Sequence, residues 1–414
     1  MNHHLADKEY VRCFDTYAPS DIYFGDAALT QLGEYLMLEG VSFAFLAIGG
    51  KSVIASGAYQ KFIEMALSFD LEVPIFRDIP AEPDVETVRA IVAELEKNKP
   101  GTMIAMGGGS VMDAAKAAWL SWQTGRDVTE LFGAGKASGA FPGKEFKRVV
   151  CIPTTAGTGS EVTPYANIVD REAGVKRLIA DEALTPRLAL VDPAFTLSMP
   201  SRLTAATAFD AMAHAIESLL NTRVKEADPE AESWAVEAVR LIVKALPEVL
   251  EKPDSLLARE RLSAAATLGG MCIRTRPTGL PHLCSFSFYG KVPHGFAVAA
   301  LLPCFWRFYL KEDAVRKATA KLIGIFPSPD PQQQPEDVIA AYESFFRTFS
   351  GIRSLRDLEG FDADMIAKIA AAAKENPVKL ETAPRPVAPA QAPEILTKLL
   401  SDALRRDSLP PRRE

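Results

Sequence analysis

Short apolar runs alternate with amphipathic stretches through the first half of this 414-residue chain, and this alternation limits the possible folds more than any other feature. The apolar runs lie at residues 43–48, 73–76, 102–106, 148–152 and 188–192. Helical patterns, such as the one at residues 86–98, separate them. Strands that alternate with helices predict a parallel sheet covered by helices. Ligands of such a sheet bind at the carboxyl ends of its strands.

The pattern changes after about residue 197. From Ser201 onward the chain is rich in Ala, Leu and Glu, and long helical patterns such as residues 231–250 replace the strand-like runs. We therefore predict two domains, an α/β domain over residues 1–198 and an all-α domain over residues 199–414.

Composition and charge exclude several classes of function. The net charge of −7 argues against nucleic acid as a partner, because nucleic acid requires clustered Lys and Arg. No run approaches the roughly 18 apolar residues of a membrane span, and the first residues lack the apolar region of a signal peptide. The five cysteines have no paired spacing and are expected to be reduced thiols. We therefore expect a cytoplasmic protein that binds neither nucleic acid nor a membrane.

A glycine-rich turn follows the apolar run at residues 102–106. It consists of Gly107, Gly108, Gly109 and Ser110. Glycine lets the backbone approach a ligand closely and adopt a positive φ. The predicted helix after the turn offers free N–H groups and the positive end of its dipole to an anion. The pattern indicates a pyrophosphate site, although a purely structural turn between a strand and a helix has the same composition.

A second polar loop follows the apolar run at residues 148–152. It extends over residues 153–163 and contains two glycines and five hydroxyl side chains, those of Thr154, Thr155, Thr158, Ser160 and Thr163. Ser or Thr at the start of a capped helix is an alternative explanation for such a loop. Two polar loops at strand ends of one sheet nevertheless favour a shared dinucleotide site.

Histidine is rare in this chain, and its placement indicates a metal site. The five histidines are His3, His4, His214, His282 and His294. The first two lie at an N-terminus that we expect to fray, and the other three fall in the predicted helical domain. Asp210 lies four residues before His214, so both project from one face of a helix, as in HExxH metal sites. A single histidine is more often a hydrogen-bonded core residue. Three imidazoles and one carboxylate, however, suit a divalent transition ion.

These two predicted sites together imply hydride chemistry. A divalent ion favours the alkoxide form of a bound alcohol, and in the reverse direction it polarises an aldehyde carbonyl. The dinucleotide would carry the hydride. We therefore expect the nicotinamide to reach from the sheet toward the helical domain, with the reaction in a cleft between the domains.

Five segments resemble motifs of the iron-containing, group III alcohol dehydrogenases. They are GGGSVMDAAK (107–116), PTTAGTGSEVT (153–163), LVDPAFTLSMP (190–200), TAATAFDAMAHAIE (204–217) and VPHG (292–295). The resemblance extends over nearly the whole chain, from residue 24 to residue 380. It implies a dehydroquinate synthase-like fold, with a Rossmann-like parallel-sheet domain that binds NAD(P) and an all-α domain that binds Fe(II) or Zn. It also implies a homodimer or a larger homo-oligomer.

The resemblance also assigns residues to each site. The metal and catalytic positions of the family fall on Asp210, His214, His282 and His294. Its cofactor positions fall on Gly107, Gly108, Gly109, Ser110, Asp113, Thr154, Thr155, Thr158, Thr163 and Lys176.

The chain departs from the family pattern near the metal positions. The connection from His282 to His294 is two residues shorter than is typical of the family. Phe286 stands where members often carry a further histidine, so water or a ribose hydroxyl must relay the proton. The aromatic stretch at residues 286–289 predicts either a pocket wall for uncharged substrates or core packing.

A third departure concerns the ribose of the cofactor. NAD-preferring members place Asp after the first strand, where this chain has Gly50, followed by Lys51 and Ser52. Loss of the carboxylate and gain of a cation would accommodate a 2′-phosphate. We therefore expect NADP(H) to be accepted and favoured, unless Lys51 is only a solvated loop residue.

Together these features predict a metal-dependent dehydrogenase for a small alcohol or aldehyde. A relative with a specialised substrate is an alternative, namely a hydroxyacid–oxoacid transhydrogenase or a phosphonoaldehyde reductase. A dehydroquinate synthase-type lyase fits less well, because the segments around the predicted ligands offer few cations, mainly Arg274, Arg276 and Lys291. A non-catalytic protein that kept the fold would not need both motifs.

Overall fold

The computed structural model describes residues 9–224, 228–329 and 331–406, which form two compact units. The first unit extends to Pro200 and also includes Lys252–Gly270. The second consists of Ser201–Glu251 and the residues from Met271 onward. Residues 252–270 therefore belong to the first unit, whereas their sequence predicts a part of the helical domain. A helical pattern predicts that a segment is a helix, but it does not say which unit the helix packs against.

A six-stranded parallel sheet forms the centre of the first unit, with the strand order β1–β9–β6–β4–β2–β3. Its strands are β1 (Asp21–Phe24), β2 (Ala44–Ile48), β3 (Ile75–Phe76), β4 (Thr102–Gly107), β6 (Val150–Pro153) and β9 (Leu188–Val191). The five predicted runs all contribute strands to this sheet. β1 was not predicted, because this edge strand exposes Asp21 and Tyr23 and therefore lacks a continuous apolar run.

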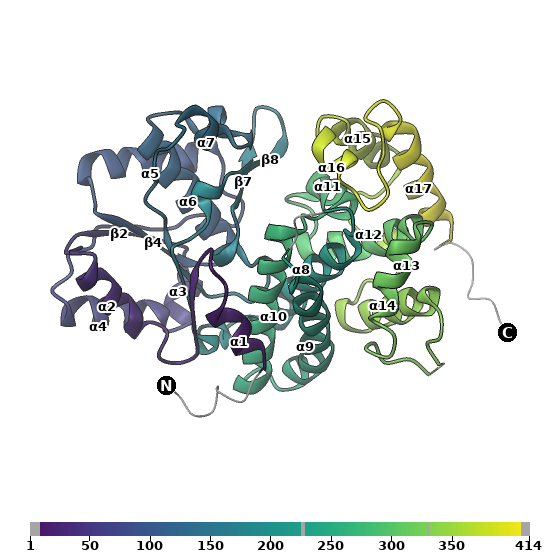
Figure 1. Ribbon diagram of the computed structural model, residues 1–414, viewed down its shortest axis with the longest axis horizontal. Coiled ribbons are helices and arrows are strands. Elements are labelled where there is room, and N and C mark those ends of the chain that lie inside the picture. Colours follow the sequence, from purple (N-terminus) through teal and green to yellow (C-terminus); the bar gives the residue numbers. More distant parts are fainter. Residues whose placement is uncertain (1–8, 225–227, 330, 407–414) are drawn as a thin grey trace. The chain divides into compact units, whose positions relative to one another are not determined.

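Helices cover both faces of this sheet. The helices before β9 are α1 (Glu9–Asp15), α2 (Thr30–Leu38), α3 (Lys51–Ala55), α4 (Ala58–Ser68), α5 (Val85–Asn98), α6 (Gly109–Thr124) and α7 (Lys136–Ala140). Figure 1 shows α5 and α6 on one side of β2 and β4, and α2 and α4 on the other. Neighbouring strand residues such as Phe45 and Leu46 belong to different core clusters, one under each pair of helices. Burial on both faces explains the uninterrupted apolar runs.

A small second sheet lies in the same unit and was not predicted. It consists of β5 (Gly133–Ala134), β8 (Val175–Ala180) and β7 (Tyr165–Asp170), with β7 and β8 antiparallel. Its strands are short and only partly buried, so they leave a weak signal in the sequence. The sheet matters for the site because Lys176 lies on β8.

The second unit is helical. Its helices are α8 (Ser201–Leu220), α9 (Ala231–Glu251), α11 (Leu280–Ser285), α12 (His294–Tyr309), α13 (Asp313–Ala320), α14 (Pro335–Ser350), α15 (Ala363–Ala373), α16 (Pro377–Glu381) and α17 (Ala392–Arg406). α8 lies at the centre of this unit, since every residue from Thr204 to Leu220 except Thr207 is buried. A polar side chain on α8 is therefore held in the interior, where it needs a partner.

Helix α10 (Leu256–Thr275) explains why part of the chain returns to the first unit. Gly270 on this helix meets Gly159 of the polar loop so closely that a Cβ on Gly270 would lie 2.6 Å from the Gly159 carbonyl oxygen. Thr267 also donates a hydrogen bond to the buried Glu161 carboxylate. α10 therefore supports the polar loop at residues 153–163.

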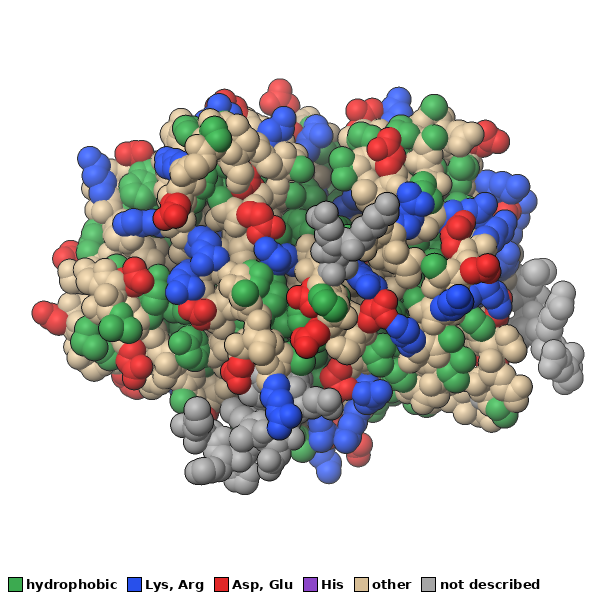
Figure 2. Space-filling view, in the orientation of Figure 1, with side chains coloured by type: hydrophobic (Ala, Val, Ile, Leu, Met, Phe, Trp, Pro, Cys, Tyr) green, Lys and Arg blue, Asp and Glu red, His purple; other side chains and the backbone are tan. Residues whose placement is uncertain are grey.

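The surface and the helices give two further observations. Acidic and basic side chains are interspersed over the face of the molecule in Figure 2. Within the described part of the chain, no helix is long and apolar enough to cross a membrane.

Candidate functional site

Helix α8 positions three acidic or imidazole side chains on one buried face. Asp210, His214 and Glu217 are four and three residues apart, so they follow one another along the same side of the helix. His282 comes from α11, and His294 is the first residue of α12. The remaining two histidines, His3 and His4, lie outside the described residues.

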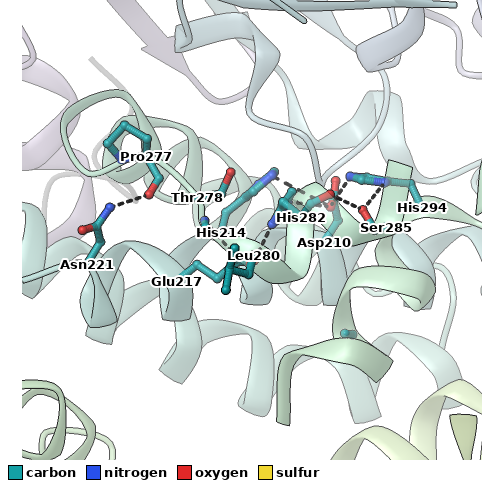
Figure 3. Close-up of polar contacts among 12 residues, drawn as sticks. Asp210, His214, Glu217, Asn221, Pro277, Thr278, Leu280, His282, Ser285 and His294 are labelled. Atoms are coloured by element: carbon teal, nitrogen blue, oxygen red, sulfur yellow. Dashed lines mark hydrogen bonds and ion pairs between the residues drawn. The ribbon is translucent and has the colours of Figure 1, made fainter. Parts of the chain in front are cut away.

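Nitrogen atoms of three imidazoles meet around one oxygen of Asp210, as Figure 3 shows. The Nε2 atoms of His294, His282 and His214 lie 3.5, 3.7 and 3.9 Å from Asp210 Oδ1. Four donors about 2.1 Å from a tetrahedral ion would lie roughly 3.4 Å apart, close to these distances. Asp210, His214 and His282 are buried, whereas His294 keeps 31% of its side-chain surface exposed.

The hydrogen bonding of these donors tests whether they fit an ion. His282 Nδ1 pairs with Glu217 Oε1, which leaves Nε2 to face Asp210. Among the described residues, neither His282 Nε2 nor Asp210 Oδ1 has a hydrogen-bond partner. Two buried acceptors facing each other are unfavourable unless a positive charge lies between them. The residues present therefore fit a divalent ion. Ligand atoms of Asp210, His214 and His282 all lie within 4.8 Å of one another, and His294 as a fourth ligand stays a prediction.

Glu217, whose role was not predicted from the sequence, is buried and orients His282. One carboxylate oxygen pairs with His282 Nδ1, and the other accepts a hydrogen bond from the Gly279 N–H at 2.8 Å. The carboxylate thereby holds both the ring of His282 and the start of α11. Imidazole ligands of metals are commonly oriented by a carboxylate in this way. The signal was present, because Glu217 lies seven residues after Asp210 on the same helix face.

A close contact between α12 and α8 brings His294 to the site. Gly295 packs directly against the backbone of α8, and a Cβ at this position would lie 1.9 Å from the Ala206 carbonyl oxygen. It would also lie 2.9 Å from the Cβ of Asp210. The glycine after His294 is therefore needed for the start of α12 to reach Asp210.

Two of the predicted ligands, His214 and Asp210, favour the protonation states that bind metal. Burial lowers the pKa of His214 to about 4, so its imidazole is neutral at pH 7. Burial alone would raise the pKa of Asp210, but the imidazoles of His214, His294 and His282 hold it below its ordinary value. Metal ions bind neutral imidazole and ionised carboxylate. His282 differs, because burial opposes its protonation but the carboxylates of Glu217 and Asp210 raise its pKa above the ordinary value.

The aromatic stretch after His282 serves two purposes. The Phe286 ring stacks on the imidazole of His294, with ring centroids 6.0 Å apart and an interplanar angle of 16°. Phe288 is buried and packs against Phe361. Phe286 therefore forms a wall beside a candidate ligand, while Phe288 belongs to the core. Of the two alternatives left open by the sequence, core packing applies to Phe288, and a pocket wall for uncharged substrates at Phe286 stays a prediction.

The two predicted polar loops meet in the first unit. β4 and β6 are neighbours in the sheet, so the turns that follow them lie at the same edge. A Cβ on Gly109 would lie 2.6 Å from the Thr158 side chain, and a Cβ on Gly108 would lie 3.3 Å from Thr155. The Thr154 N–H also donates to the Gly107 carbonyl at 2.9 Å.

The glycines at residues 107–109 differ from the prediction in one respect. None of them has a positive φ, and Gly108 is extended with φ −79° and ψ −178°. A Cβ on Gly107 would lie 2.6 Å from Val111, just as one on Gly109 would contact Thr158. These glycines are therefore required by close packing, and not by a left-handed backbone.

The Lys116 side chain stabilises the polar loop at residues 153–163 by hydrogen bonds to its backbone. This role was not predicted from the sequence. Its buried ammonium donates to the carbonyl oxygens of Ser160 at 2.9 Å and Thr163 at 3.2 Å. Asp113, on the preceding turn of α6, accepts hydrogen bonds from the Ser160 hydroxyl and the Asn167 N–H. Both carboxylate oxygens of Asp113 are thus engaged by protein donors, which gives this predicted cofactor residue a part in shaping the loop.

Two other predicted cofactor residues, Ser110 and Lys176, both contact the segment at residues 81–82. The Ser110 hydroxyl donates to the Ala81 carbonyl oxygen. Lys176 on β8 forms an ion pair with Glu82 at 2.6 Å. The structure therefore places Lys176 near the start of α6.

Gly50, Lys51 and Ser52, which are predicted to contact the ribose of the cofactor, have a carboxylate close by. Gly50 precedes α3, and Lys51 and Ser52 are exposed on its first turn. Asp78, which follows β3, lies beside them, with Oδ1 3.6 Å from the position of a Cβ on Gly50. Sequence analysis missed Asp78 because it follows a different strand.

One unit is α/β and has two polar loops at one edge of its sheet. The other unit is helical and has a buried cluster of donor atoms. Together these features are typical of a protein that binds a dinucleotide and a metal ion. Sequence profiles agree with this class. The profile of iron-containing alcohol dehydrogenase matches residues 19–193, and that of the C-terminal part of the Fe-containing alcohol dehydrogenase family matches residues 204–400. The chain belongs to the iron-containing alcohol dehydrogenase family.

Individual proteins are similar to most of the chain. Aldehyde-alcohol dehydrogenase 2 of Entamoeba histolytica is 35% identical over 298 residues, 69% of this chain and 33% of that protein. The 1-propanol dehydrogenase PduQ of Salmonella typhimurium is 34% identical over 260 residues, 62% of this chain and 65% of that protein. The matched regions thus span only about a third and two thirds of these relatives. A crystal structure of 1,3-propanediol oxidoreductase superimposes with a TM-score of 0.80 at 27% identity, covering 91% of this chain and 97% of that one.

Proposed function

We propose that this protein is a metal-dependent oxidoreductase that transfers a hydride between NAD(P)(H) and a small alcohol or aldehyde. The observation that carries the proposal is the convergence of His294, His282 and His214 on Asp210 Oδ1 at 3.5, 3.7 and 3.9 Å. The polar loops at the sheet edge support a dinucleotide partner. Similar proteins named as 1-propanol and aldehyde-alcohol dehydrogenases support the same substrate class.

Asp210 and the three imidazoles would hold Fe(II) or Zn(II), which lowers the pKa of an alcohol and polarises a carbonyl when it is bound. One carboxylate and three neutral imidazoles carry a single negative charge, so the occupied site would retain positive charge for a developing alkoxide. Glu217 orients His282, and the Phe286 ring stacks on one side of the His294 ring. The chain's own residues would thus position the ion.

The dinucleotide would bind at the sheet edge, where its nicotinamide supplies or accepts the hydride. Free N–H groups at the start of α6 suit the pyrophosphate. We further propose that NADP(H) is favoured, because exposed Lys51 can attract a 2′-phosphate and Gly50 leaves space for it. Asp78 acts in the opposite direction, because its carboxylate favours unmodified ribose hydroxyls.

The function is tested on protein stripped of metal and reloaded with Fe(II) or Zn(II), assayed with aldehydes and either NADPH or NADH. We expect turnover only after reloading, and a higher kcat/KM with NADPH. Lys51→Ala should lower kcat/KM for NADPH about 10-fold and leave NADH nearly unchanged, as expected for loss of one ionic contact to phosphate. Metal-independent turnover, or no turnover with any aldehyde, would refute the function. An equal or better kcat/KM with NADH would refute only the cofactor preference.

A further inference from the structure

Lys379 brings a cation to the residues around the candidate metal centre. It lies on α16, and its Nζ donates to the Thr278 hydroxyl at 2.7 Å and approaches the Thr278 carbonyl oxygen at 3.5 Å. Thr278 is buried and directly precedes Gly279, whose N–H is held by Glu217. Figure 3 shows Thr278 and Glu217 beside the imidazole cluster. Lys379 is therefore anchored to the segment that leads into His282.

The same ammonium lies next to the aromatic wall of the site. Nζ is 5.7 Å from the centroid of the Phe286 ring, within the range of a cation–π contact. Phe286 in turn stacks on His294. Lys379 and a candidate metal ligand therefore contact the same aromatic side chain.

Lys379 has no anionic partner within the described part of the chain. No described carboxylate lies within 4.0 Å of its Nζ, and both oxygens of Glu217 are already engaged by His282 and Gly279. Burial lowers the pKa of Lys379 to about 8, although Glu217 acts in the opposite direction, so the ammonium is charged at pH 7. Holding a charge in a half-buried position with only neutral acceptors is unfavourable.

From this placement we infer that Lys379 binds an anionic group of the substrate, so that the preferred substrates are short aldehydes or alcohols carrying a carboxylate or sulfonate. The inference rests on the proposed function and names its substrate class. It differs from the expectation based on the aromatic stretch at residues 286–289, which favoured uncharged substrates. The Phe286 ring would accommodate the carbon chain, and the anionic group of the substrate would supply the counter-charge that Lys379 lacks.

The test compares matched aldehydes on the metal-loaded enzyme. Butanal and 4-oxobutanoate differ in having a methyl group or a carboxylate at the far end, and propanal and 2-oxoethanesulfonate provide the same comparison for a sulfonate. We expect kcat/KM for at least one anion to exceed that of its neutral partner about 10-fold or more. Lys379→Met should lower this ratio about 10- to 100-fold, mainly through KM, as expected for loss of a charge-assisted hydrogen bond.

Two further variants separate recognition from a structural role. Lys379→Arg keeps the charge and should retain most of the ratio, and Lys374→Met, at an exposed lysine nearby, should retain all of it. A Lys379→Met variant that lowers kcat/KM equally for both members of a pair would overturn the inference. So would a wild-type enzyme that prefers butanal and propanal, and this result needs no variant to fold. Failure to reduce any of the four aldehydes would instead refute the proposed function.

Discussion

At the scale of single residues, the donor cluster depends on a carboxylate that is not itself a donor. Glu217 lies on α8, yet it pairs with His282 on α11 and with the backbone at Gly279. An imidazole without such a partner can rotate and can bind through either nitrogen. The orientation of Nε2 toward Asp210 therefore depends on Glu217.

We predict that Glu217→Gln weakens metal binding while leaving most of the fold intact. The amide oxygen can accept from only one of the two donors, His282 Nδ1 or the Gly279 N–H, and the amide lacks the charge that pairs with His282. Loss of such a partner typically lowers metal affinity about 10- to 100-fold. Competition between the protein and a chelator for Co(II) measures the affinity, and the Co(II) absorption bands should shift with the altered geometry. Glu251→Gln, at the exposed end of α9, is the control, and an equal loss there would contradict a positioning role.

At the scale of elements, the site depends on how closely α12 approaches α8. The contact is closest at Gly295, where the two backbones leave no room for a side chain. His294 precedes this contact, so the approach of the helices sets the distance from His294 to Asp210. The sequence motif VPHG thus combines a candidate ligand with the glycine that places it.

Gly295→Ala should push the start of α12 away from α8. The overlap with the Ala206 carbonyl oxygen predicts a loss of stability of about 1–3 kcal/mol, as for other overpacked cores. It also predicts weaker metal binding, because His294 moves with the helix. Denaturant unfolding and metal titration measure the two effects. Gly139→Ala is the matched control, because a Cβ on Gly139 of α7 meets nothing within 4 Å. Wild-type metal affinity in Gly295→Ala would show that α12 tolerates the added methyl group.

At the scale of the whole molecule, each compact unit contains one of the two candidate ligand sites. The donor cluster lies entirely in the helical unit, whereas the polar loops lie in the α/β unit with α10 supporting them. A ligand stabilises the structure that binds it, by about 2.7 kcal/mol when its concentration is 100 times Kd. Each ligand should therefore protect a different part of the chain.

Hydrogen exchange tests this division. Removing metal with a chelator should increase amide exchange in α8, α11 and α12, and it should lower the Tm. Adding NADPH should protect the loops at residues 107–110 and 153–163. Asp210→Ala should abolish the effect of metal on exchange and leave the effect of NADPH in place. If metal protected the central sheet while α8 exchanged as before, the ion would bind elsewhere.

Local patterns were sufficient to predict five of the six strands of the large sheet, the glycine-rich turn and the pair formed by Asp210 and His214. Strand and helix periodicities follow from backbone geometry over a few residues, so they can be recognised in the sequence. The glycines at residues 107–109, by contrast, were predicted to allow both a close approach to a ligand and a positive φ, and the structure lacks the positive φ. The residue type was informative, but its reason was close packing.

Packing between distant segments decided the remaining features. Glu217 and His282 are 65 residues apart, and Lys379 and Thr278 are 101 residues apart. No periodicity relates such pairs, because their meeting depends on how whole helices cross. The membership of residues 252–270 in the first unit has the same origin, since Gly270 and Gly159 meet only when α10 packs against the polar loop. Spacing along the chain thus identified the chemical groups, and the packing of helices determined which of them meet.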